Sequence, residues 1–394
     1  MSETQRAGTG PWGASELFQL LRDGQPYTRA DLAERAGLAR STVGLRVDEL
    51  LGLGLIAPVG EAASSGGRPP SQFALNPGAR LVLAVDCGAS HQTVVISDLA
   101  SNILATDLQR RPIADGPERV LGHAVETARK LLASIGRSES DLIAAGIGLP
   151  GPVEHATGRP VKPPIMPGWD GFDVPAWMMA SLGIPALVDN DVNIMAIGER
   201  TVAFPTTEDL LFVKVATGIG SGIFSGGTLQ RGAQGTAGDL GHVRVSRGDG
   251  VRCDCGNEGC LEAMASGPAI ARQLREQGVE VTSAAEVLEL VAAGDATAIA
   301  AVRQAGRDIG EVLTTCVSLI NPSVIVIGGS MANAGEHLIA GIHDVVDARS
   351  MPIATSSLSI VLSAAGEVAG VIGASVLASE HALSPQSVEA LLAS

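Results

Sequence analysis

Three of the chain's five cysteines lie close together, at Cys253, Cys255 and Cys260. Clustered thiols are typical of metal sites in reducing compartments, where disulfides are rare. His242 precedes the first of these cysteines by eleven residues and can supply a fourth ligand. Three thiolates and one imidazole fill the tetrahedral shell of Zn²⁺ and leave no open position, as in structural zinc sites. The spacing therefore predicts structural zinc, in preference to a chance cluster or a redox-active trio.

A carboxylate that could take part in proton transfer lies in the stretch ALVDNDVN, where an apolar segment delivers Asn190 and Asp191 to the start of an expected helix. A carboxylate beside a hydroxyl can accept its proton during phosphoryl transfer. In a protein that only binds a hydroxyl compound, the same pair would donate and accept hydrogen bonds. Asp at this position can also cap a helix. Asp191 is therefore compatible with an enzyme and with a binding protein.

Glycine-rich turns follow several apolar segments that we expect to be buried strands. The residues of interest in these turns are Asp86, Gly88, Thr217, Gly218, Gly220, Gly328 and Gly329. Such turns present backbone N–H groups to phosphates, although a single turn of this kind is not specific. Because the turns recur in two halves of the chain, they predict a nucleotide or a sugar in a cleft between two lobes.

The first eighty residues show a different sequence pattern from the rest of the chain. Three short helices are expected there, within SELFQLLRDG, TRADLAERAG and STVGLRVDELLGLGLI. A short helix, a turn with glycine and a helix that opens on small polar and basic residues indicate a helix-turn-helix. Two short β-prone pieces around a Gly/Ser loop indicate a wing. The residues expected to contact DNA are Arg40, Ser41, Thr42 and Arg46 in the third helix and Arg68 in the wing. A helical bundle used for packing or dimerisation is the alternative.

The charge distribution limits the possible partners. The net charge of the 394 residues is −15, which argues against a general polyanion binder. Residues 1–80 carry eight arginines and eight acidic residues, so the rest of the chain carries the whole excess. We expect two or three domains from the length. The sequence contains neither an apolar run long enough for a membrane span nor an N-terminal signal core, so we expect a cytoplasmic protein.

From about Leu81 onward the chain resembles the ROK family of repressors and sugar kinases. The resemblance rests on the motifs DCGAS, GIGLPGPV, LVDNDVN, ATGIGSGIFSGGTLQRGAQGTAGDLGH, CDCGNEGCLE and NPSVIVIGGSM. It implies an α/β fold, with a two-lobed actin/hexokinase-like (ribonuclease H-like) body behind an α+β winged helix-turn-helix domain. We place the DNA-binding domain at residues 1–78 and the body at 79–394. Lobe I would span about 79–195 plus a C-terminal helix over 375–394, and lobe II about 196–374.

The resemblance also implies roles for individual residues. It assigns the four zinc ligands named above, and a sugar site made of Asn190, Asp191, Asp239, His242 and Glu262. It assigns the glycine-turn residues named above, which include Asp86, to a nucleotide-binding site. In the kinases of the family the aspartate that matches Asp191 is the general base, and ATP with Mg²⁺ would be the cofactor of a kinase.

Departures from the kinase pattern shift the functional interpretation. The first loop reads Asp86-Cys87-Gly88-Ala89-Ser90-His91, where kinases carry a second glycine and a lysine. Asp239 is one methylene shorter than the usual Glu, and KPPIMPGW lacks an asparagine that kinases carry. We therefore expect a sugar-responsive transcriptional regulator, a homodimer or tetramer that binds operator DNA and releases it when a sugar effector binds. An ATP-dependent sugar kinase, a bifunctional protein and a zinc-binding scaffold are the alternatives.

Overall fold

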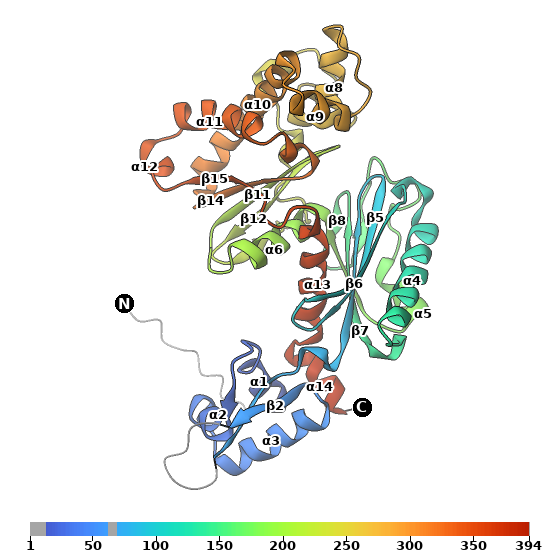
Figure 1. The fold of residues 1–394 in the computed structure, drawn as a ribbon, viewed down its shortest axis with the longest axis vertical. Coiled ribbons are helices and arrows are strands. Elements are labelled where there is room, and N and C mark those ends of the chain that lie inside the picture. The colour runs from blue at the N-terminus through green and yellow to red at the C-terminus, as the bar shows by residue number, and fades with distance from the viewer. Residues whose placement is uncertain (1–12, 62–68, 394) are drawn as a thin grey trace.

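The computed structural model describes residues 13–61 and 69–393, and its long axis carries a small domain followed by two lobes (Figure 1). The small domain is a winged helix. Its elements are α1 (Ala14–Gln19), β1 (Tyr27–Thr28), α2 (Arg29–Ala36), α3 (Arg40–Gly52), β2 (Ile56–Glu61) and β3 (Ser71–Leu75). The strands form an antiparallel sheet in the order β1-β3-β2. This confirms the predicted fold of the front domain.

Local sequence signals explain where α2 begins and ends. The Thr28 hydroxyl accepts a hydrogen bond from Asp31 N, and the Asp31 carboxylate accepts from Thr28 N, so the two residues form a capping box. Gly37 ends the helix with a φ of +67°, a conformation that favours glycine. The inward face of α3 buries Val43, Val47 and Leu50, as the 3.6-residue period requires.

The body contains two five-stranded sheets with the same topology. The strands of lobe I are β4 (Leu81–Cys87), β5 (His91–Asp98), β6 (Ile103–Arg110), β7 (Leu142–Leu149) and β10 (Ala186–Asn190), in the order β10-β7-β4-β5-β6. The strands of lobe II are β11 (Leu210–Val215), β12 (Ile219–Ser225), β13 (Thr228–Gln230), β14 (Val324–Gly328) and β15 (Ser359–Leu362), in the order β13-β12-β11-β14-β15. In each sheet the three strands that come first in the chain are antiparallel, and the remaining two extend the sheet in parallel from the first of them, so the glycine turns follow the carboxyl ends of the parallel strands.

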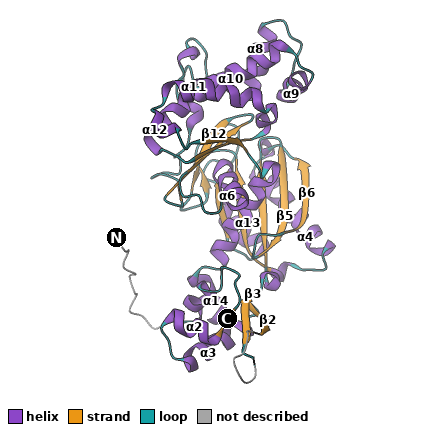
Figure 2. Ribbon diagram, turned by 60° about the vertical axis from the view of Figure 1, so that its left-hand side comes forward, coloured by secondary structure: helices purple, strands orange, loops and turns teal. Residues whose placement is uncertain are grey.

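Helices cover both faces of each sheet (Figure 2). In lobe I, α4 (Pro117–Ser134) and α5 (Val174–Leu182) share a core with β4, β5 and β7. In lobe II, the long α10 (Ala296–Ile320) and α11 (Glu336–Arg349) form the outer layer with α8 (Gly267–Glu276) and α9 (Ala284–Ala292). The helix α6 (Asp191–Ala203) packs against β11 and β12 of lobe II and against α13 (Ala369–Ala382) of lobe I, so it joins the lobes.

The contact between α6 and α13 depends on glycine. A Cβ on Gly373 would lie 1.7 Å from Ile194 O, and a Cβ on Gly198 would lie 1.9 Å from Ala369 O. The two helices therefore approach closely enough for backbone atoms to touch, which larger residues would prevent. This close approach fixes the start of α6 relative to the lobe I sheet.

The C-terminus departs from the expected single helix over 375–394. The structure has two helices there, α13, which begins earlier at Ala369, and α14 (Pro385–Ala393). The second helix packs against α1 of the winged helix, where Ser15 Oγ donates to Glu389 Oε2 at 3.0 Å. Gln19 Nε2 donates to Leu383 O at 2.9 Å. The C-terminal helix α14 therefore packs on the winged-helix domain, whereas the expected domain boundaries had placed it in lobe I.

Candidate functional site

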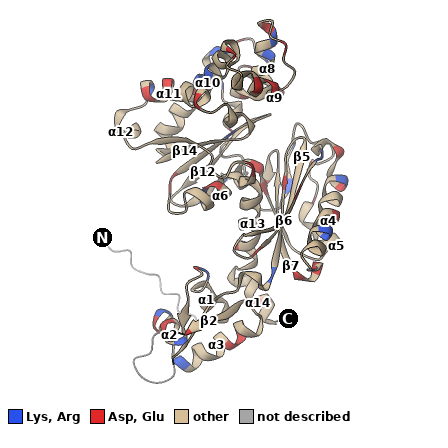
Figure 3. Cartoon of the chain, viewed as in Figure 1, with Lys and Arg blue, Asp and Glu red and all other residues tan. Residues whose placement is uncertain are grey.

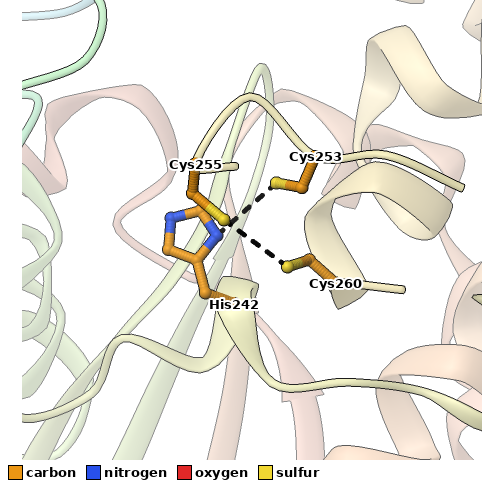
Figure 4. A group of neighbouring side chains, drawn as sticks. All are labelled: His242, Cys253, Cys255 and Cys260. Carbon is orange, nitrogen blue, oxygen red and sulfur yellow. Dashed lines mark hydrogen bonds between the residues drawn. The ribbon is translucent and has the colours of Figure 1, made fainter. Parts of the chain in front are cut away.

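The four predicted metal ligands converge on one point (Figure 4). The ligand atoms of His242, Cys253, Cys255 and Cys260 all lie within 4.8 Å of one another. Cys255 Sγ lies 3.7 Å from Cys260 Sγ, and Cys253 Sγ lies 3.7 Å from His242 Nδ1. Sulfurs at the corners of a tetrahedron around zinc, with Zn–S bonds of about 2.3 Å, would lie about 3.8 Å apart. The set therefore fits a closed tetrahedral metal site and does not form a disulfide.

Short backbone connections hold the ligands in place. Cys260 is the N-cap of α7 (Leu261–Ala265) and is 1% exposed. His242 ends a short 3-10 turn, Leu240–His242, and Val243 O accepts a hydrogen bond from Leu261 N at 2.8 Å. A metal at this site would join the loop that carries His242 to the helix that carries Glu262. The imidazole presents Nδ1 to the thiols, so Nε2 is the nitrogen left for a ligand.

Asp191 lies where the two lobes meet, at the first position of α6, and pairs with Lys214 of lobe II. Its Oδ2 accepts a hydrogen bond from Lys214 Nζ at 2.5 Å, and only 6% of the Asp191 side chain is exposed. The helix cap is supplied by Asn190 instead, whose Oδ1 accepts from Val192 N at 2.9 Å. The Asn190 amide also donates to Gly151 O at 2.9 Å. Lys214 is a residue of the site that the sequence reasoning missed.

The remaining predicted sugar contacts lie along β12. Glu262 Oε2 accepts a hydrogen bond from Ile219 N at 3.0 Å. Asp239 is exposed and directly follows Gly238, whose carbonyl accepts from Ser221 N at 2.8 Å. A Cβ on Gly241 would lie 2.2 Å from Ile219 O, so glycine is required for the loop to approach this strand. The loop therefore brings the Asp239 and His242 region to the Glu262 side of the cleft.

The first glycine turn differs from a phosphate-binding loop. A Cβ on Gly88 would lie 2.3 Å from His91 Cε1, so the imidazole packs directly on this glycine. Burial lowers the pKa of His91, and the nearby Lys214 lowers it further, so the ring is neutral at pH 7. A neutral ring over the turn occupies space that a phosphate would need. This agrees with the weakened first loop that the sequence indicated.

The turns of lobe II lie together at the ends of parallel strands. Lys214 of β11 pairs with Gly328 of β14, so Gly329 lies beside Val215, the last residue of β11. Gly329 has a φ of +83°, and a Cβ on it would lie 2.6 Å from Val215 O. Thr217 is exposed. A Cβ on Gly218 would lie 2.6 Å from Glu262 Oε2, so the Glu262 carboxylate packs against this turn.

Asp86 faces this region from lobe I and has an unusual protonation state. Burial, and repulsion from Asp191, raise its pKa to about 7, although Lys214 opposes the shift. The folded protein therefore retains a proton on Asp86 that the unfolded chain releases near pH 3.8. Stability should decrease as the pH rises from about 4 to about 7 and remain reduced above that range.

We expect Asp86→Asn to remove this pH dependence, because the amide cannot ionise. The full shift corresponds to at most roughly 4 kcal/mol, and partial exposure of the carboxylate to the cleft reduces it. Thermal melting of both proteins at pH 5, 6, 7 and 8 measures the effect. Relative to wild type, the melting temperature of the variant should rise most above pH 7. Glu126→Gln, a substitution of an exposed residue, serves as control. Parallel profiles for wild type and Asp86→Asn would contradict the assignment.

The candidate DNA interface lies at the start of α3, on the part of the molecule far from the lobes (Figure 3). Arg40 and Ser41 are exposed, and Thr42 is half-buried. Arg40 forms no ion pair with another described residue. Arg46 differs, because its guanidinium donates to both Glu49 oxygens at 3.1 Å. Arg68 lies outside the described residues.

Comparisons with known proteins agree with this geometry. The chain matches the ROK family over residues 82–381. A xylose repressor of Bacillus spizizenii is 27% identical over 368 residues, which cover 93% of this chain and 94% of that one. A glucokinase of Halalkalibacterium halodurans is 32% identical over 274 residues, which cover 66% of this chain and 83% of that protein.

A solved structure shares the whole architecture. It is a ROK family transcriptional regulator, a homologue of the Escherichia coli MLC protein, and it superposes with a TM-score of 0.81 at 24% identity. The match covers 96% of this chain and 98% of the other, so it extends through the winged helix as well as the body. None of the described helices is long and apolar enough to cross a membrane. The two-lobed fold and the match over residues 82–381 together show that the chain belongs to the ROK family.

Proposed function

We propose that the protein is a sugar-responsive transcriptional regulator that represses genes of carbohydrate uptake or metabolism. The observation that carries this proposal is the shared core between the winged helix and the lobe I side of the body. Ala378, Ala382 and Val388 are buried in one cluster with the front domain's core. A change in the body can therefore reach the DNA-binding helix through packed side chains. The names of the relatives, which include a xylose repressor and an N-acetylglucosamine repressor, support the same class.

The sugar would bind between the lobes, and zinc would organise one rim of its pocket. The ring Nε2 of His242, the carboxylates of Asp239 and Glu262, and Asn190 offer donors and acceptors suited to sugar hydroxyls. Zinc held by the Cys3His set would supply no open position for chemistry and would act as a structural link. A homodimer would place two copies of α3 on a palindromic operator, about one DNA turn apart.

A sugar can regulate operator binding only if its affinity differs between the DNA-bound and DNA-free forms. The test begins with selection of a duplex from a random-sequence pool by the purified protein. Fluorescence anisotropy then measures the affinity for that duplex with and without D-xylose, D-glucose and N-acetylglucosamine. We expect one sugar to weaken operator binding. Equal affinity with every sugar of a wider hexose, pentose and amino-sugar panel would refute the proposal.

Arg40→Ala is expected to weaken operator binding by about 1–3 kcal/mol, because Arg40 is exposed at the start of the recognition helix and forms no ion pair within residues 13–61 and 69–393. Sugar affinity should not change, since Arg40 lies far from the cleft. Anisotropy and calorimetry measure the two affinities. The matched control is Arg349→Ala, an exposed arginine on lobe II. An Arg40→Ala variant with wild-type operator affinity would exclude this helix as the DNA-reading element.

An ATP-dependent sugar kinase with Asp191 as general base is the second candidate. The intact turns at Thr217, Gly218 and Gly329 favour it. The ion pair between Lys214 and Asp191 and the position of His91 over Gly88 argue against it. ADP release coupled to sugar addition, with Asp191→Asn as control, distinguishes a kinase or bifunctional protein from a regulator without catalysis.

A further inference from the structure

A single charged side chain interrupts strand β11, whose sequence is LLFVKV. The five other residues of the strand are buried and apolar, while the Lys214 side chain is 21% exposed and reaches the cleft. Burying an ammonium group is costly unless it is paired and hydrogen-bonded. Here the pairing partner is Asp191 Oδ2, 2.5 Å from Nζ. The strand therefore carries a lysine whose position is explained by this one carboxylate.

The surroundings keep Lys214 charged. Burial alone would lower the pKa of its amine. The attraction of Asp191 and the hydrogen bond to it outweigh burial, Asp86 and Glu262 add smaller attractions, and the pKa is raised. Lys214 is thus the ammonium group on which three carboxylates of both lobes act. His91 adds no positive charge, because its ring is neutral.

A second ion pair of the same kind involves Asp189, the residue that precedes Asn190 in the chain. Asp189, which is 2% exposed, accepts from Arg231 Nε at 2.7 Å and from Asn193 Nδ2 at 2.8 Å. Arg231 follows β13 of lobe II, and Lys214 belongs to β11 of the same lobe. Both acidic neighbours of Asn190 are therefore held by a cation from lobe II. This arrangement fixes the start of α6, and with it the Asn-Asp pair, to the opposite lobe.

A general base would behave differently at this position. A proton transferred from a sugar hydroxyl to Asp191 would neutralise the carboxylate and leave the Lys214 ammonium without its partner. Removing one member of a buried ion pair is strongly unfavourable. Asp191 can still accept a hydrogen bond at Oδ1, for which the described residues provide no partner. The geometry suits a group that binds a hydroxyl without removing its proton.

We propose that Lys214 is a positioning residue of the sugar site, which pairs with Asp191 and fixes the orientation of its carboxylate so that the cleft binds a neutral sugar without phosphoryl transfer. This inference deepens the proposed function and rests on it. Lys214 acts through Asp191 and does not itself need to contact the sugar. Its effect on binding should therefore disappear when Asp191 no longer carries a charge.

The test is a double-mutant cycle of Lys214→Met, Asp191→Asn and the double variant, with Lys214→Arg added to preserve the charge. Thermal unfolding without ligand is the first readout. Asp191→Asn should lower the melting temperature of the wild type, but should raise that of Lys214→Met, because it removes a carboxylate left unpaired beside Asp86. Calorimetry with D-xylose, D-glucose and N-acetylglucosamine is the second. Lys214→Met should weaken binding about tenfold or more, and the double variant should bind no more weakly than Asp191→Asn.

Lys130→Met is the matched control, since Lys130 is exposed on α4 and should affect neither readout. Independent, additive effects of the two substitutions on sugar affinity would overturn the proposal. Measurable sugar-dependent ADP release by the wild type would also overturn it. If Lys214→Met does not fold, Lys214→Arg decides: retained sugar affinity supports the proposal, and a loss as large as that of Asp191→Asn refutes it. If no sugar binds the wild type, the proposed function fails, and the unfolding cycle alone decides whether Lys214 acts through Asp191.

Discussion

Cys260→Ser is expected to release the metal from purified protein and to abolish the sugar response. Wild-type protein should contain about one zinc per chain, because three thiolates and one imidazole at tetrahedral spacing form a closed zinc shell. Serine is a poor zinc ligand, and loss of one ligand should reduce the zinc content to a small fraction. Elemental analysis by mass spectrometry after gel filtration measures this directly.

Loss of the metal should also weaken sugar binding. Cys260 is the N-cap residue of α7, and Glu262 lies in the first turn of that helix. Without the metal, the loop carrying His242 and the helix carrying Glu262 lose their common link, so sugar affinity should fall by about tenfold or more. Cys316→Ser is the matched control, because Cys316 is also buried but lies in α10 away from the cluster. Zinc-free wild type, or a Cys260→Ser variant with full zinc, would contradict the assignment.

Features that depend on local sequence were predictable. Three of the four predicted metal ligands are close in sequence, with the three cysteines within eight residues, and the structure brings them together with His242. The caps of α2 and the period of α3 likewise follow from short-range rules. The residues of the first glycine turn could be recognised as altered from the sequence, but only the structure shows that the His91 ring lies on Gly88.

Features that depend on long-range packing were not predictable in this way. The pairing of Lys214 with Asp191 joins residues 23 positions apart on different elements. Its one sequence signal was a lysine inside an otherwise apolar strand, in a chain that has only three lysines. The docking of α14 on α1 joins the two ends of the chain, across 374 residues for Ser15 and Glu389. Helical periodicity locates such a helix but cannot tell which surface it covers.

The helix α13 extends from Asp86 in lobe I to the winged-helix domain. At its N-terminal end, a Cβ on Gly370 would lie 2.1 Å from Asp86 Oδ2, so the helix backbone contacts the Asp86 carboxylate. At its C-terminal end, Arg22 of the winged helix forms an ion pair with Glu380. Fourteen helical residues extend about 20 Å. The single helix α13 thus contacts both Asp86 in lobe I and the winged helix. Coupling between two sites requires a physical connection of this kind.

Val388→Asp is expected to separate α14 from the winged helix. Val388 is fully buried in α14 within the core that α14 shares with the winged helix, and an unpaired carboxylate there should cost several kcal/mol. The helix should undock and expose α1, so that operator affinity falls about 100-fold or more and the remaining binding no longer responds to sugar. Zinc content and sugar affinity should stay at wild-type levels, because the cleft does not include α14. Hydrogen exchange of residues 14–21 reports the undocking, and anisotropy reports the operator affinity.

Ala390→Asp introduces the same charge on the exposed side of α14 and should leave both readouts unchanged. The comparison separates loss of docking from a general effect of added negative charge near the DNA-binding domain. Undocking with retained sugar-dependent operator release would show that the signal travels through the connection near Asn76 and Arg80 instead of through α13 and α14. Loss of the sugar response with intact zinc and intact sugar binding would establish that the C-terminal helices carry it, since no other measured property of the cleft would have changed.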